Sequence, residues 1–112
     1  MLQISHATRI FVCSQFVDFR KGIDGLSALC RGKLDQNPFS GTLFLFRNRS
    51  CSSIRILIYD GQGFWLCTKR LSQGKFHWWL NDHIDARKLH TLLWNGNPEL
   101  ANFSKDWKKI SI

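Results

Sequence analysis

The chain has 112 residues and a formal net charge of +8, because 16 lysines and arginines face only 8 acidic residues. This length suits a single domain over 1–112, and a hydrophobic content of 44% with five Trp and nine Phe excludes a disordered chain. No apolar run approaches the roughly 18 residues of a membrane span and the first residues lack the features of a signal peptide, so we expect a cytoplasmic protein with no membrane contact.

The N-terminal third predicts a strand followed by a helix. The segment TRIFVCS, residues 8–14, is rich in β-branched and aromatic side chains, which favours a strand. From VDFRKGIDGL onward, apolar side chains recur at spacings of three and four residues, which predicts a helix over 18–34. The side chains expected to pack this helix on a sheet are Phe19, Ile23, Leu26, Leu29 and Cys30.

The expected start of this helix carries an unusual pair of charges. Asp18 stands where an N-cap belongs, because its carboxylate can accept a backbone N–H of the first turn. Arg20 and Lys21 would then lie in the first turn, at the positive end of the helix dipole, where cations are disfavoured. Two explanations fit this pair: the cations are solvated, or a negatively charged partner approaches them.

The middle of the chain predicts an antiparallel meander. Residues 34–41 contain turn-forming Asn, Pro, Ser and Gly, and therefore predict a loop. In one of the following stretches Ile54, Ile56 and Ile58 occupy alternate positions, so they share one face of a strand. Strands joined by short turns are expected over 42–48, 53–60, 63–71 and 75–80.

The C-terminal third predicts a second helix over 82–96, with Gly96 as a fitting stop and Pro98 preventing continuation. Residues 97–112 are compatible with a short helix or with a flexible basic tail that orders on binding. The fold class expected from this order is α+β, a single domain with a mainly antiparallel sheet and two main helices.

The sequence shows no catalytic constellation. It has no phosphate-binding glycine loop, no G-x-S-x-G or H-E-x-x-H motif, and no pair of carboxylates placed to hold divalent cations. The four cysteines, at positions 13, 30, 51 and 67, match no zinc-binding spacing, and without a secretion signal we expect them to be reduced. We therefore expect no catalytic residue, no metal and no cofactor.

Three motifs occur in a characteristic order: VDFRKGIDGL, NPFSGTLFLFRNR and IRILIYDGQGFWLCTKRLSQGKF. Together, over about residues 7 to 96, they resemble the small accessory protein, called Orf2-like or TnpB, of the insertion-sequence family numbered sixty-six. That accessory protein is distinct from the RNA-guided nuclease that shares the TnpB name. The resemblance implies a role in transposition of a bacterial mobile element, beside a separate, larger transposase that carries the acidic catalytic residues.

The residues that match the recurring positions of this family fall within the three motifs. The first motif supplies Asp18, Arg20, Lys21, Gly22, Asp24 and Gly25. The second supplies Pro38, Phe39, Gly41, Phe46, Arg47 and Arg49. The third supplies Asp60, Gly61, Gly63, Lys69, Arg70, Leu71 and Gly74. The chain departs from the family at RSCSS, where members usually carry more charge, and in its C-terminal segment.

Six cations at strand ends and at the expected helix start predict an anion-binding patch that contacts DNA, with the element ends as the expected partner. They are Arg20, Lys21, Arg47, Arg49, Lys69 and Arg70. The net basic charge supports a polyanionic partner. The alternative is a solvated strand end whose cations pair with Asp18 and Asp24.

Two adjacent tryptophans, Trp78 and Trp79, predict a partner-binding surface, because neighbours in a strand face opposite sides. The alternative is that the second helix buries the Trp that faces away from the core. An outward Trp, one of these or Trp94, would stack on an unpaired base or anchor the cognate transposase or another accessory subunit. The function expected is a non-catalytic accessory protein that binds DNA, the transposase or both. A protein-interaction subunit without direct DNA contact is the alternative, and an enzyme of unknown chemistry is the weaker third hypothesis.

Overall fold

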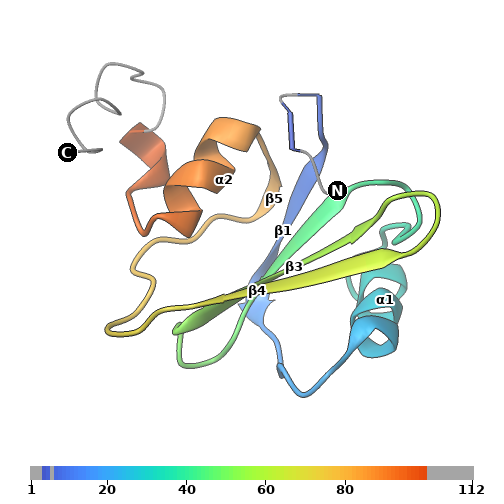
Figure 1. Cartoon of the computed structure of the whole chain (residues 1–112), viewed down its shortest axis with the longest axis horizontal. Helices are drawn as coiled ribbons and strands as arrows, with labels where there is room; N and C mark the ends of the chain where they lie inside the picture. The colour runs from blue at the N-terminus through green and yellow to red at the C-terminus, as the bar shows by residue number, and fades with distance from the viewer. Residues whose placement is uncertain (1–3, 6, 101–112) are drawn as a thin grey trace.

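The computed structural model describes residues 4–5 and 7–100, which form a five-stranded sheet with a helix on each face (Figure 1). The strands are β1 (Ile10–Phe16), β2 (Leu43–Arg47), β3 (Ser53–Tyr59), β4 (Phe64–Arg70) and β5 (Asp82–Ile84). The helices are α1 (Ile23–Arg31), α2 (Ala86–Leu93) and the 3-10 turn Pro98–Leu100. The expected α+β class, with a mainly antiparallel sheet and two main helices, is confirmed. Residues 101–112 of the expected tail lie outside the described residues.

The strand order is β4-β3-β2-β1-β5, and one neighbouring pair is parallel. β2, β3 and β4 form the antiparallel meander expected from their short connections. β1 runs parallel to β2, with Ile10 opposite Leu43, because α1 carries the chain back to the starting end of the sheet. β5 covers the other side of β1 in antiparallel register. The parallel pair was not predicted from the sequence.

The sheet is covered on both faces, so the protein has two apolar cores. On the α1 face, Leu26 and Cys30 of α1 pack with Phe44 of β2. On the α2 face, Leu89 and Leu92 of α2 pack on the opposite side of the same strands. The isoleucines of β3 that were predicted to share one face all lie in this second core: Ile54, Ile56 and Ile58. Figure 1 shows α1 and α2 on opposite sides of the sheet.

Helix α1 is shorter than the helix predicted over 18–34. It begins at Ile23, where Gly22 occupies the N-cap position without a side-chain hydrogen bond. It ends at Arg31, and Gly32 is its C-cap, with a backbone N–H that donates to the Ala28 carbonyl at 2.9 Å. The predicted apolar stripe is confirmed, because all five of its side chains pack in the α1-face core, fully or partly buried.

The segment 75–80 is not a strand, and this prediction was wrong. Its backbone pairs with no strand of the sheet, although Phe76 is buried in the α2-face core and Trp79 packs against that core. An apolar run that lies across a face of a sheet has the same composition as a strand within it, so periodicity could not separate the two.

The predicted helix over 82–96 contains two elements. Its first three residues form β5, and α2 follows. Asp85 is the N-cap of α2, because its carboxylate accepts the backbone N–H of Lys88 at 2.8 Å. None of the described helices is long and apolar enough to cross a membrane.

The four cysteines are free thiols, as expected. Cys13 and Cys30 are buried, whereas Cys51 and Cys67 are partly exposed. Burial raises the pKa of the Cys13 thiol, and raises that of Cys30 to about 12. The two buried thiols therefore act as small core side chains.

Candidate nucleic-acid interface

One end of the sheet gathers a set of cations. β1 and β2 are parallel and both finish at this end, and β4 finishes there beside the start of β3, because β3 and β4 are antiparallel. The strand ends and the loops that follow them carry the cations predicted to bind nucleic acid. We call this surface the cationic end and define it by Arg20, Lys21, Arg47, Arg49, Arg55, Lys69 and Arg70.

The turn between β1 and α1 places Arg20 and Lys21 ahead of the helix and not in its first turn. Asp18 is therefore not the N-cap that was predicted. Its carboxylate accepts the backbone N–H of Arg20 at 2.9 Å and forms an ion pair with the guanidinium at 2.7 Å. The predicted conflict with the helix dipole does not arise, because the helix starts after both cations. The Arg20 side chain is still 91% exposed and can meet an anion.

We expect the Asp18 carboxyl to titrate with a pKa of about 2, because hydrogen bonds from the Arg20 side chain and backbone stabilise its ionised form. The ion pair is then intact above the ordinary aspartate value of 3.8 and is lost as the pH falls through about 2. Carbon-13 NMR of the side-chain carboxyl measures this titration. In Arg20→Gln the pKa should rise towards 3.8, whereas Lys21→Gln should change it little. An unshifted pKa in Arg20→Gln would contradict this geometry.

Arg55 ties the turn between β1 and α1 to the sheet. Its guanidinium donates to the carbonyl oxygens of Phe19, at 2.7 Å, and Lys21, at 3.1 Å. Its Nε–H donates to Thr68 Oγ1 at 3.0 Å. The guanidinium carbon also lies 4.4 Å from the centre of the Phe19 ring. These contacts use the Nε–H and Nη1 donors of Arg55, so it positions the turn that carries Arg20 and Lys21.

Aromatic rings and guanidinium groups stack where β1 and β2 end. The Arg47 guanidinium lies 4.5 Å from the centre of the Phe16 ring and 5.0 Å from that of Trp79. It also donates to the Ser14 carbonyl at 3.1 Å. The exposed Arg49 lies 5.8 Å from the same Phe16 ring. Arg47 is therefore held within the fold, whereas Arg49 faces solvent beside it.

Lys69 and Arg70 are neighbours in β4 and therefore face opposite sides of the sheet. Lys69 donates to the Leu93 carbonyl at the end of α2 and lies 4.8 Å from the centre of the Trp94 ring. A cation at a helix C-terminus satisfies a carbonyl that has no partner within the helix. Arg70 is exposed, opposite Ser53 of β3. The six predicted cations thus share one end of the sheet but not one face.

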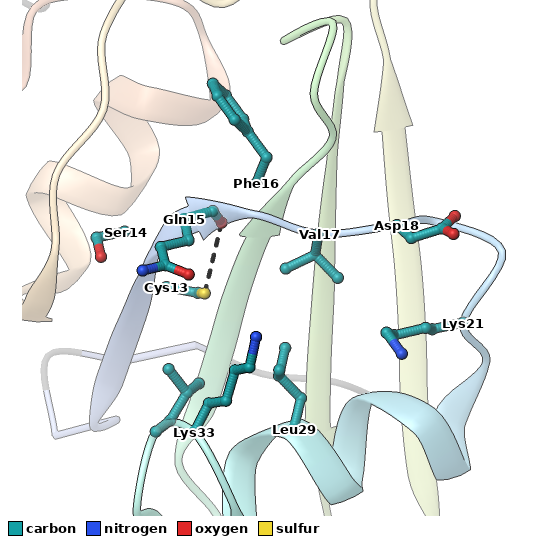
Figure 2. A pocket seen from close by; sticks show the side chains of 10 residues that line it. Cys13, Ser14, Gln15, Phe16, Val17, Asp18, Lys21, Leu29 and Lys33 are labelled. Carbon is teal, nitrogen blue, oxygen red and sulfur yellow. Dashed lines mark hydrogen bonds between the residues drawn. The ribbon is translucent and has the colours of Figure 1, made fainter.

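Two grooves open beside the turn between β1 and α1. One, of about 780 Å³, lies between this turn and the turn after β2, and its lining includes Phe16, Arg20 and Arg49. The other, of about 440 Å³, lies between the end of β1 and α1, and its lining includes Lys21. Figure 2 shows the second groove, with Phe16 directed away from α1. Asp18 is the acidic residue that lines both grooves.

The tryptophans divide between the interior and the surface. Trp79 is partly buried, and its indole N–H donates to the Cys13 carbonyl at 2.8 Å. Trp78 is 44% exposed and Trp94 is 73% exposed. One of the adjacent pair therefore faces outward and one inward, although 75–80 is not a strand. The sequence interpretation missed Phe16, which is 43% exposed, because it lies beyond the predicted end of the first strand.

The chemistry available at the cationic end is anion binding and ring stacking. Guanidinium and ammonium groups bind phosphate oxygens, and an exposed aromatic ring stacks on a base. Within residues 4–5 and 7–100, no three His, Cys, Asp or Glu side chains are arranged to hold a metal ion.

Known proteins place the chain in one family. The profile of the IS66 Orf2-like proteins matches residues 8–98. The protein y4jC of Sinorhizobium fredii is 43% identical over 76 residues, which span 68% of this chain and 65% of the relative, just under two thirds of its length. The protein y4hO of the same organism is 38% identical over 78 residues, which span 70% of this chain and 68% of the relative. No solved structure gives a significant match. The chain therefore belongs to the IS66 Orf2-like family.

Proposed function

We propose that this protein is a non-catalytic accessory protein that binds the sugar–phosphate backbone of DNA through its cationic end. The observation that carries this proposal is the gathering of four exposed cations where β1, β2 and β4 finish: Arg20, Lys21, Arg49 and Arg70. Asp18 pairs with Arg20 and offsets one of the four charges. The remaining positive charge favours a polyanion at this end of the molecule.

The cations of this end divide into two kinds. Arg47, Arg55 and Lys69 donate to backbone carbonyl oxygens and stabilise the loops and α2. The four exposed cations are the expected phosphate ligands. Phosphate contacts orient a protein on DNA without reading its sequence, so we expect little base preference from these four side chains. The DNA expected for this accessory role is the two ends of the insertion sequence, and we expect the protein to bind them in the cytoplasm.

Binding to an element-end duplex should weaken steeply with salt. If each of the four exposed cations contacts one phosphate, the log–log slope is about −3.6, at roughly 0.9 per contact. The double variant Arg49→Gln/Arg70→Gln should lose about 1.8 from the magnitude of that slope. Fluorescence anisotropy of a labelled duplex across a salt series measures it, with thermal melts showing that the variant is folded.

A matched control removes the same charge from the opposite end of the sheet. Arg31 ends α1, and Lys88 lies beside the residues that lead into β1. Arg31→Gln/Lys88→Gln should therefore leave the slope at its wild-type value. If both double variants change the slope equally, only net charge matters and the proposed interface is wrong.

The second candidate is a protein-interaction subunit without DNA contact, which the exposure of Trp94 and Trp78 favours. Under this function the cognate transposase is captured equally well with and without element-end DNA, and capture resists salt. Substitution of the contacting Trp by Ala should then cost about 2 kcal/mol of binding free energy or more. A pull-down with and without the duplex separates the two functions.

A further inference from the structure

Strand β4 is an open edge of the sheet. β3 pairs with one side of β4 along all seven of its residues, and no strand in the described part of the chain pairs with the other side. The opposite edge, β5, has only three residues. None of the residues of β4 is buried, although it begins Phe-Trp-Leu-Cys. A long, apolar, unpaired edge is a template for another strand.

The hydrogen bonds that flank β4 show which of its backbone groups face outward. The Leu71 N–H donates to the Ser52 carbonyl at 2.9 Å, and the Gly63 carbonyl accepts the Asp60 N–H at 3.0 Å, so both of these odd-numbered residues face β3. Backbone groups of successive residues in an antiparallel strand point to alternate sides. The outward N–H and C=O groups therefore belong to the even-numbered residues Phe64, Leu66, Thr68 and Arg70.

We infer that a second copy of this chain pairs with β4 in antiparallel register, about a two-fold axis at Cys67. In this register Phe64 lies opposite Arg70 of the second copy, and Leu66 lies opposite Thr68. All four outward residues are then paired within the two strands. A register centred on Leu66 or on Thr68 leaves an outward residue opposite a position beyond the end of β4. The interface is isologous and closes at two copies.

The side chains of this register are complementary as well. Trp65 faces Lys69 of the second copy and Phe64 faces Arg70, so cations meet aromatic rings. A register centred on Lys69 would instead bring like charges together, which destabilises a cross-strand pair. Of the antiparallel registers compared, the one centred on Cys67 therefore pairs β4 best with β4 of a second copy.

Cys67 supplies a direct test, because the two-fold axis places it opposite Cys67 of the second copy. It forms a non-hydrogen-bonded pair, in which Cα atoms lie about 4.5 Å apart, within the roughly 4.4–6.8 Å that a disulfide spans. Copper phenanthroline in air should oxidise the two thiols to a disulfide, with oxygen as the electron acceptor. A non-reducing gel should then show twice the chain mass of 13.1 kDa.

Two cysteine variants identify the linked thiol. Cys67→Ser should abolish the cross-link but still sediment as a dimer. Cys51 is the other partly exposed thiol, and Cys51→Ser should keep the cross-link. Cross-linking that persists in Cys67→Ser and is lost in Cys51→Ser overturns the inference.

A backbone variant tests the pairing itself. Thr68→Pro removes an outward N–H, and proline is tolerated on an edge strand where the N–H faces solvent. This variant should sediment as a monomer with an unchanged circular dichroism spectrum. Thr68→Val also loses the hydroxyl that accepts from Arg55, but it keeps the N–H and should remain dimeric.

The inference is overturned if Thr68→Pro is as dimeric as Thr68→Val. A wild-type chain that sediments as a monomer and forms no cross-link overturns it too, as does open-ended association in place of a dimer. If Thr68→Pro fails to fold, the Cys67 cross-link in the wild-type chain tests the pairing instead.

Discussion

Replacing Phe44 with alanine is expected to lower the free energy of unfolding by about 3–5 kcal/mol, because the ring fills the middle of the α1-face core. Phe44 is fully buried as the second residue of β2, where it packs against Phe11 with ring centres 6.1 Å apart. Its removal leaves a cavity between the sheet and α1, since neighbouring side chains cannot fill the space. Urea denaturation at one fixed protein concentration measures the loss.

Phe39 provides the matched control for this substitution. It is 51% exposed and contacts the rings of Tyr59 and Phe64 at centre distances of 5.0 and 5.2 Å. Phe39→Ala loses ring contacts but opens no cavity, so we expect a loss of about 1 kcal/mol. Similar losses for the two alanine variants would mean that Phe44 is not at the centre of a packed core.

Arg55→Met should destabilise the protein by about 1–3 kcal/mol, because it leaves carbonyl oxygens of the turn before α1 without their donor. Methionine keeps an apolar side chain against the Phe19 ring, so the loss reports mainly on the hydrogen bonds to the Phe19 and Lys21 carbonyls. DNA affinity should fall as well, because the turn that presents Arg20 and Lys21 loses its anchor. Denaturation and anisotropy of the same preparation measure both effects.

Arg49→Met makes the same chemical change at an exposed position. The Arg49 guanidinium donates no hydrogen bond to any of the described residues, so its loss should change the free energy of unfolding by less than about 0.5 kcal/mol. It should still weaken DNA binding through the lost charge. Equal stability of the Arg55→Met and Arg49→Met variants would show that Arg55 does not anchor the turn.

The strands of the meander could be predicted because their signals are local. The apolar run 42–48 marks a strand covered on both faces, and β2 is that strand. The short turn expected between 53–60 and 63–71 is confirmed, since Gly61 adopts a φ of 98° and the Asp60 carboxylate accepts the N–H groups of Gln62 and Gly63, both at 2.9 Å. Each signal depends only on residues adjacent in the chain.

The elements that were misjudged depend on distant contacts. The start of α1 is set by a turn that Arg55 anchors from β3, which the first motif alone does not reveal. The segment 75–80 is drawn across the α2 face by the core that receives Phe76. Parallel pairing of β1 with β2 arises because α1 returns the chain to the starting end of the sheet, and amphipathic spacing does not specify the direction in which a helix crosses a sheet.

Part of the candidate site could be predicted from the sequence for the same reason. Strand ends rich in cations were visible in the sequence, and the topology brings them to one end of the sheet. The sequence did not show which of these cations form hydrogen bonds within the fold and which face solvent. Lys69 is occupied by the Leu93 carbonyl, 24 residues later in the chain, and Arg47 by the Ser14 carbonyl, 33 residues earlier.

The position of β1 has a consequence for the order of folding during synthesis. Ile10 lies between Leu43 of β2 and Ile84 of β5, both far along the chain. Closing such long loops costs more entropy than pairing β2, β3 and β4, which follow one another through short turns. We therefore expect the meander to form first. Until residues 82–84 leave the ribosome, the far edge of β1 is open, and nascent chains on one messenger are then most exposed to joining one another through it.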